Sequence, residues 1–146
     1  MGNLKEKDVL KDSSAEESRN SNDILGELRK NGINVEEALS YSMDDVDFYI
    51  DILGTFIESY YEKIDELEKY YVDHNWNDYR IQVHALKSSA RTIGADHLSE
   101  MALRQEDAAK EMNEAVLIAD HETLMKEYGA VVNLLKDILG MNDDSK

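Results

Sequence analysis

The chain has 146 residues and contains neither cysteine nor proline, which excludes disulfides, thiolate metal sites and thiol catalysis and favours long uninterrupted helices. Its length suits a single domain, and a hydrophobic fraction of 42% is enough for one core. The formal net charge of −16 argues against nucleic-acid binding, because the phosphates would be repelled.

The N-terminal part of the chain reads as a polar segment followed by two short helices. Residues 1–22 are polar and mixed in charge, so we expect a tail or linker there. The apolar residues of 23–30 share one helical face, and the Asn-Gly pair that follows should end this helix. Asn34 with Glu37 three residues later is typical of a capping box, which predicts a second short helix up to Tyr41.

A long helix is predicted next, up to about Asp73. Ser42 to Asp45 supply its N-cap signal, with acidic residues placed to complement the helix dipole. Gly54 lies inside this helix, and we expect it to mark a close approach of another helix, since it costs about 1 kcal/mol against alanine. The apolar stripe repeats at steps of seven, four and three residues, as bundle packing requires: Val46, Leu53, Ile57, Tyr60, Ile64, Leu67 and Tyr71.

Three more helices are predicted in the second half of the chain. The first spans about 76–93 and stops at Gly94, the second is capped by Asp96, and the third follows Asn113 and ends at Leu139. The connection at Gly94 is so short that the first two helices should form an antiparallel hairpin. The middle helix should extend to about Met112, with an inner face formed by Leu98, Met101, Ala102, Gln105, Ala109 and Met112.

The sequence therefore predicts an all-α protein, an antiparallel four-helix bundle with one or two short extra helices at the N-terminus. Residues 23–140 would form the bundle domain, and 141–146 a polar C-terminal tail. No apolar run approaches the roughly 20 residues that span a bilayer, and the N-terminus has no apolar core segment of a signal peptide. We therefore expect no membrane insertion, a cytoplasmic location and, for this class of fold, a monomer.

The helix predicted over 76–93 has two faces of different character. One side carries the residues expected in the core: Trp76, Tyr79, Val83, Leu86, Ala90 and Ile93. The opposite side carries the residues expected in water: Arg80, His84, Lys87, Ser88 and Arg91. Three cations and an imidazole thus share one exposed face of a strongly acidic chain. An imidazole among cations and small residues indicates a place where an anion can be received.

This segment resembles the histidine-containing phosphotransfer (HPt) domain of bacterial and fungal phosphorelays. The motif of that family is His-x-Leu-Lys-Gly-x-x-x-x-x-Gly. His84, Leu86, Lys87 and Gly94 match it in place, whereas Ser88 replaces the first glycine. The resemblance implies that His84 is the phosphoacceptor and that Lys87 stabilises the phosphoryl group. It extends, more loosely, from about Ile24 to Leu139.

The resemblance also implies an acceptor that orients the imidazole, 22 residues after the histidine on the next helix. That position is Glu106, and Gln105, which points more toward the core, is the second choice. The implied partners are a response-regulator receiver domain and a sensor or hybrid histidine kinase. The receiver domain would bring the aspartate and the Mg²⁺, so no cofactor is expected on this chain. The remaining polar residues would form a partner-binding rim, unless the arginines pair with acidic residues: Arg80, Ser88 and Arg91.

Three other functions compete with a phosphorelay. A di-iron carboxylate bundle needs Glu-x-x-His on two helices, and no histidine here has a glutamate three residues before it, so no metal site is expected. A helical interaction module without phosphorylation and the substrate domain of a chemotaxis-type histidine kinase both stay open. The chain has no P-loop glycine pattern and no kinase signature, so we expect a phosphocarrier and not an ATP-dependent enzyme.

Overall fold

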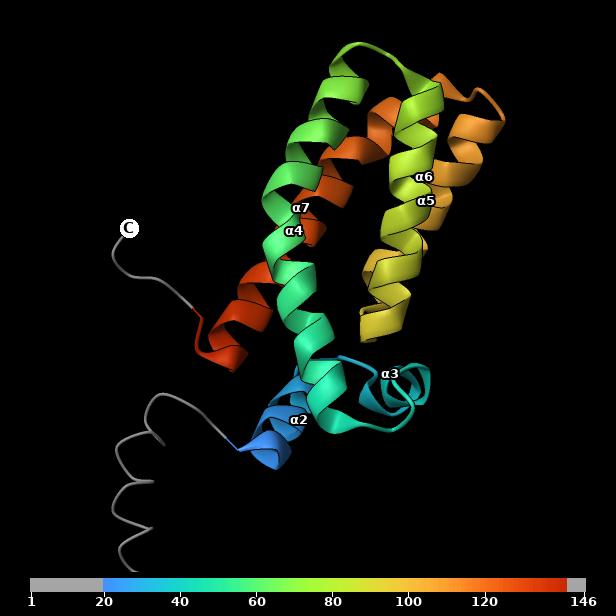
Figure 1. The fold of residues 1–146 in the computed structure, drawn as a ribbon. Helices are drawn as coiled ribbons and strands as arrows, with labels where there is room; N and C mark the ends of the chain where they lie inside the picture. The colour runs from blue at the N-terminus through green and yellow to red at the C-terminus, as the bar shows by residue number, and fades with distance from the viewer. Residues whose placement is uncertain (1–19, 142–146) are drawn as a thin grey trace, which may run out of the picture.

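The computed structural model describes residues 20–141, and this part of the chain contains six helices and no strand (Figure 1). Each long helix packs against the next one along the chain, and the first also packs against the last, which closes the ring. The four long helices are α4 (Val46–Val72), α5 (Trp76–Ile93), α6 (Asp96–Lys110) and α7 (Glu114–Leu139). Connections of two or three residues between them make neighbours antiparallel. The predicted all-α antiparallel four-helix bundle is confirmed.

The two predicted short helices, α2 (Ser21–Lys30) and α3 (Val35–Tyr41), are present and lie across one end of the bundle (Figure 1). Helix α2 begins two residues earlier than expected, because the side chain of Asn20 accepts a hydrogen bond from the Asp23 N–H at 2.9 Å and caps it. The predicted tails lie outside the described residues, except for the few at their inner ends.

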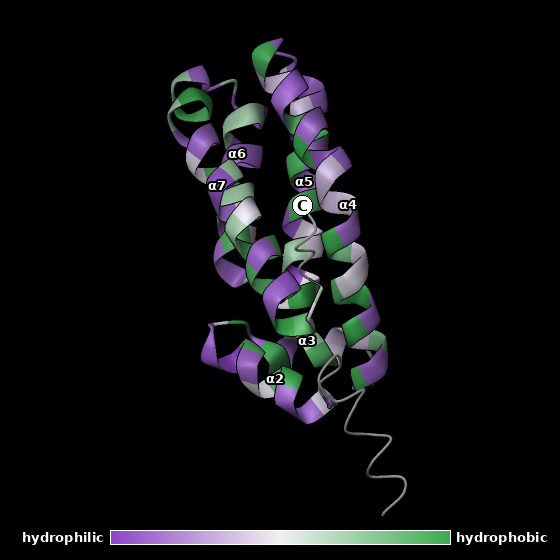
Figure 2. Ribbon diagram, turned by 90° about the vertical axis from the view of Figure 1, so that its left-hand side faces the viewer, coloured by the Kyte–Doolittle hydropathy of each residue, from purple (hydrophilic) through white to green (hydrophobic). Residues whose placement is uncertain are grey.

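Helices α3, α4 and α7 begin at polar residues that the sequence analysis named for their starts: Asn34, Asp45 and Asn113. Five of the six have an N-cap side chain that accepts a hydrogen bond from the N–H three residues later: Asn20, Asn34, Asp45, Asn75 and Asn113. Each of the helices alternates hydrophobic and hydrophilic bands along its length (Figure 2). The hydrophobic stripes meet in one continuous core.

Helix α6 departs from the prediction at both ends. Its N-cap is Ala95, which makes no side-chain cap bond, and Asp96 is the first helical residue. The Asp96 carboxylate instead accepts a hydrogen bond from the Asn34 side-chain amide at 3.1 Å. The helix ends at Lys110, and Met112, with a φ of 54° and 66% of its surface exposed, belongs to the turn and not to the inner face.

A chain of polar side chains crosses the core and includes one residue from each long helix: the buried Gln105, Tyr79 and His121, and the exposed Glu68 at the outer end. The Gln105 amide donates to the Leu117 carbonyl at 3.1 Å and to the Tyr79 hydroxyl oxygen at 3.0 Å. Tyr79 therefore donates its own proton to His121 Nδ1 at 2.8 Å, and His121 Nε2–H donates to Glu68 at 3.1 Å. Each donated hydrogen thus has one acceptor, which makes a buried polar chain tolerable in an apolar core, although Gln105 Oε1 has no hydrogen-bond partner within residues 20–141.

The α5–α6 turn is attached to the start of α3 by a close backbone contact and to α4 by a side-chain hydrogen bond. The Asn34 N–H donates to the Gly94 carbonyl at 2.9 Å, and the Tyr49 hydroxyl donates to the Ile93 carbonyl at 2.8 Å. Gly94 has a φ of +89°, and a Cβ there would lie 2.6 Å from the Asn34 carbonyl oxygen. In contrast, a Cβ on Gly54 would meet no atom within 4 Å, so the close helix approach predicted there is wrong.

Candidate functional site

The exposed face of α5 carries the candidate site. All six residues predicted for the buried side of this helix are buried, which confirms its rotational setting. His84 is on the opposite side, with 57% of its side chain exposed. Because α5 and α6 form a tight antiparallel hairpin, residues in the middle of α5 lie across from residues in the middle of α6. This geometry brings Glu106 of α6 to His84.

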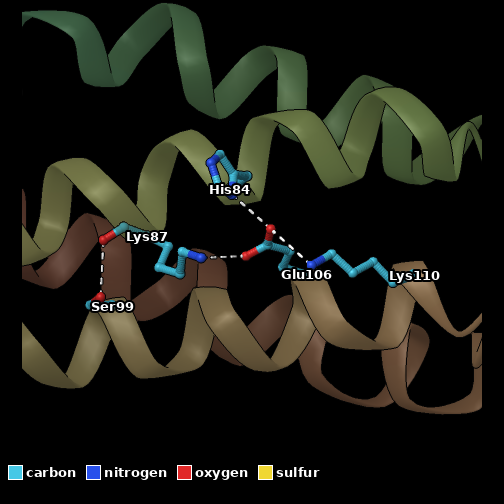
Figure 3. A network of polar contacts seen from close by, with 5 residues as sticks. All are labelled: His84, Lys87, Ser99, Glu106 and Lys110. Atoms are coloured by element: carbon cyan, nitrogen blue, oxygen red, sulfur yellow. Dashed lines mark hydrogen bonds and ion pairs between the residues drawn. The ribbon is translucent and has the colours of Figure 1, made fainter.

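Glu106 holds the imidazole from the adjacent helix. Its Oε2 lies 2.7 Å from His84 Nδ1, and only 3% of the glutamate side chain is exposed (Figure 3). Gln105, the second choice for this role, instead points into the core toward Tyr79 and Leu117. The pair of residues that the resemblance suggested is therefore in direct contact, with the carboxylate buried and the imidazole open to solvent.

Two lysines surround the same carboxylate (Figure 3). Lys87 Nζ lies 2.8 Å from Oε1 of Glu106, and Lys110 Nζ lies 3.7 Å from Oε2. Burial by itself would raise the pKa of the Glu106 carboxyl, but Lys87 and His84 outweigh it, and the pKa is held below its ordinary value of 4.5. The carboxylate is therefore ionised at neutral pH.

The charge of Glu106 determines which nitrogen of His84 can react. An ionised carboxylate can only accept hydrogen bonds, so Nδ1 must carry the hydrogen that it donates to Glu106. In the neutral ring, Nε2 then holds the free lone pair. Within residues 20–141, Nε2 has no hydrogen-bond partner, and the ring is more than half exposed. This nitrogen is a nucleophile that an incoming group can reach.

Two residues of the network were not anticipated from the sequence. Ser99 of α6 donates its hydroxyl hydrogen to the Lys87 carbonyl oxygen at 2.9 Å and ties the two helices together beside the site (Figure 3). Lys110 lies one turn after Glu106, a spacing at which lysine and glutamate pair on a helix, so this signal was present. Ser99 carries no such local signal, because its partner is a backbone atom of another helix.

The three residues proposed as a binding rim lie around His84 on α5. Arg80 is half-buried and lines an open groove of about 450 Å³ together with Lys110 and Trp76. Ser88 is exposed, and its carbonyl accepts a hydrogen bond from the Thr92 hydroxyl at 2.9 Å. Arg91 is exposed, and in the described part of the chain neither arginine forms an ion pair with an acidic residue. Both guanidinium groups thus remain available to a partner.

Residues 20–141 contain neither a metal-binding cluster nor a membrane-spanning helix. No group of three or more histidine, aspartate or glutamate side chains is arranged to hold a metal ion in this part of the chain. Among the helices of this same range, none combines the length and the apolar character needed to cross a bilayer.

The family comparison agrees with the geometry of the site. A family model described as "Hpt domain" matches residues 51–139, which include α5, α6, α7 and most of α4. Helices α2 and α3 precede the matched range. A search of curated proteins found no match, and a search of solved structures found none either.

Proposed function

The chain belongs to the Hpt domain family of two-component phosphocarriers, and we propose that it is a phosphorelay intermediate that accepts a phosphoryl group on His84 Nε2. In this proposal the group is exchanged with an aspartate of a response-regulator receiver domain. The observation that carries the proposal is the exposed imidazole whose Nδ1 is held by a buried, ionised glutamate. A surface histidine without a function would not need a buried carboxylate to hold its ring.

The proposed transfer uses the lone pair of Nε2. This nitrogen forms a bond to phosphorus while the P–O bond to the partner's aspartate breaks, and the aspartate leaves as a carboxylate. The ring keeps the hydrogen on Nδ1 and becomes positively charged. Glu106 at 2.7 Å stabilises that charge, which lowers the energy of the phosphorylated state. In the reverse direction the aspartate carboxylate bonds to phosphorus, the Nε2–P bond breaks, and the neutral imidazole is the leaving group.

Partner binding is proposed for the same face of α5. Arg80, Ser88 and Arg91 surround His84 and would contact the receiver domain. A sensor or hybrid histidine kinase would be the original source of the phosphoryl group. We propose that Mg²⁺ belongs to the receiver domain and that this chain works in the cytoplasm as a monomer, without ATP chemistry of its own.

A partner-independent experiment tests the acceptor role. Phosphoramidate should transfer its phosphoryl group to His84, with loss of ammonia, and peptide mapping should find the acid-labile group there. The His84→Gln variant should accept none and keep the wild-type far-UV circular dichroism, because the ring is exposed. His97→Gln removes another exposed histidine and should leave modification unchanged. Equal modification of all four histidines would refute a special reactivity of His84.

Transfer to receiver domains tests the second half of the proposal. The phosphorylated chain, freed of phosphoramidate, is mixed with purified receiver domains from the organism that encodes it. Rapid loss of the label from His84 and its appearance on one receiver would support a relay. A label that stays on His84 with every receiver would favour an interaction module.

A further inference from the structure

Lys87, the cation expected at the phosphoryl group, is already engaged in the unphosphorylated protein. Its Nζ lies 2.8 Å from Oε1 of Glu106, and only 27% of its side chain is exposed. Ser99 fixes the carbonyl of the same lysine from α6. If Lys87 left, Oε1 would remain buried without an ionic partner, and an uncompensated buried charge is costly. These contacts hold Lys87 to Glu106.

Lys110 has the opposite properties. Its Nζ is 3.7 Å from Oε2 of Glu106, a loose contact, and 54% of its side chain is exposed. It could leave without stranding the carboxylate, because Oε2 retains His84 at 2.7 Å and Oε1 retains Lys87. The stem of Lys110 borders the open groove of about 450 Å³ described above, so it has room to move.

Lys110 is also close to the reacting ring. Its Nζ and His84 Nδ1 contact the same oxygen, so they are no farther apart than the sum of 3.7 and 2.7 Å. Lys87 contacts the other oxygen of the carboxylate. Arg80, one turn before His84 on α5, lines the same groove as Lys110.

We propose that Lys110 is the residue that binds the phosphoryl group on His84, while Lys87 stays with Glu106 and keeps that carboxylate ionised. This inference rests on the proposed function, because it requires phosphorylation of His84. Phosphorylation adds a charge of about −1.5 to −2 at neutral pH, which exceeds the charge of the carboxylate that Lys110 contacts now. The more exposed and less constrained lysine therefore turns to the new anion.

The pKa of the phosphoryl group measures which lysine touches it. A cation in contact favours the dianion and lowers its pKa, so removal of that cation should raise it. Each variant is phosphorylated with phosphoramidate and titrated by phosphorus NMR. Lys110→Gln should raise the phosphoryl pKa by roughly 0.5, as expected for the loss of one solvent-exposed ion pair, and Lys110→Arg should restore the wild-type value. Lys87→Gln should change the phosphoryl pKa less and raise the pKa of Glu106, followed by carbon NMR of its carboxyl.

The chain offers a matched control on α7. Lys126 follows Glu122 by four residues, and the two form an exposed ion pair at 3.6 Å, the same spacing as Lys110 and Glu106. Lys126→Gln therefore removes the same charge from the same kind of pair and should leave the phosphoryl pKa unchanged. If Lys87→Gln raises the phosphoryl pKa and Lys110→Gln does not, the inference is overturned and the proposed function stays intact. Absence of phosphorylation in the wild-type protein would overturn both.

Discussion

Replacing Gly94 by alanine should destabilise the protein, and the structure gives the size of the effect. At a φ of +89°, an L-residue costs about 1–2 kcal/mol more than glycine. Its Cβ would lie 2.6 Å from the Asn34 carbonyl oxygen, a backbone atom that no rotamer change can move. Separating the two segments breaks the hydrogen bond from the Asn34 N–H to the Gly94 carbonyl, worth about 1 kcal/mol. The free energy of unfolding should fall by about 2–3 kcal/mol in total.

Gly54→Ala is the control, because it makes the same chemical change where the structure has room. Nothing lies within 4 Å of the new Cβ, and the position is inside a helix, so the free energy of unfolding should rise by about 0.5–1 kcal/mol. Both variants are compared with wild type by urea unfolding, followed by far-UV circular dichroism. A loss below about 1 kcal/mol at Gly94 would refute the tight contact with α3.

Two further variants examine the buried polar groups. Tyr79→Phe should lower the free energy of unfolding by about 1–3 kcal/mol, because Gln105 and His121 each lose a buried partner; an unchanged urea midpoint would show that water replaces the hydroxyl. Glu106→Gln tests the charge at the site through pH. The folded-state pKa of Glu106 lies below its ordinary value of 4.5, so its contribution to stability is present above 4.5 and is lost as pH falls through the folded pKa. The stability advantage of the wild type over Glu106→Gln should therefore shrink on acidification in urea titrations, and a constant difference would contradict this account.

Much of the fold follows from local sequence signals. Apolar repeats at helical spacing, with N-cap signals for some of the helices such as Asn34 and Asp45, predicted all six helices and the four-helix bundle. The side of α5 that carries His84 was predictable because helical rotation separates it from the core stripe. Helical periodicity alone did not predict the contact between His84 and Glu106. That prediction came from the family resemblance, which supplied the spacing of 22 residues across two helices.

The structure differs from the prediction at positions whose contacts come from a segment far away in the sequence. Asp96 has the character of an N-cap, but the amide of Asn34, far away in the sequence, binds its carboxylate. Gly54 could equally mark a close approach or an open position, and only the packed neighbours distinguish the two. The contact of Ser99 with a backbone carbonyl on α5 leaves no pattern in the sequence. These features depend on which helices meet, and local propensity does not contain that information.

The buried polar chain has a consequence for redesign of this core. Apolar stripes of leucine and alanine can find new contacts after one helix slides along another. The directional hydrogen bonds that link Gln105, Tyr79, His121 and Glu68 form in only one alignment of the four helices. Gln105 immediately precedes Glu106, so the alignment that gives the Gln105 NH2 group its two acceptors also aims the carboxylate at His84. A displacement of α6 by one residue would turn that carboxylate by about 100° away from the imidazole. An all-apolar core could keep the helices and their stability and still lose the proposed phosphorylation site.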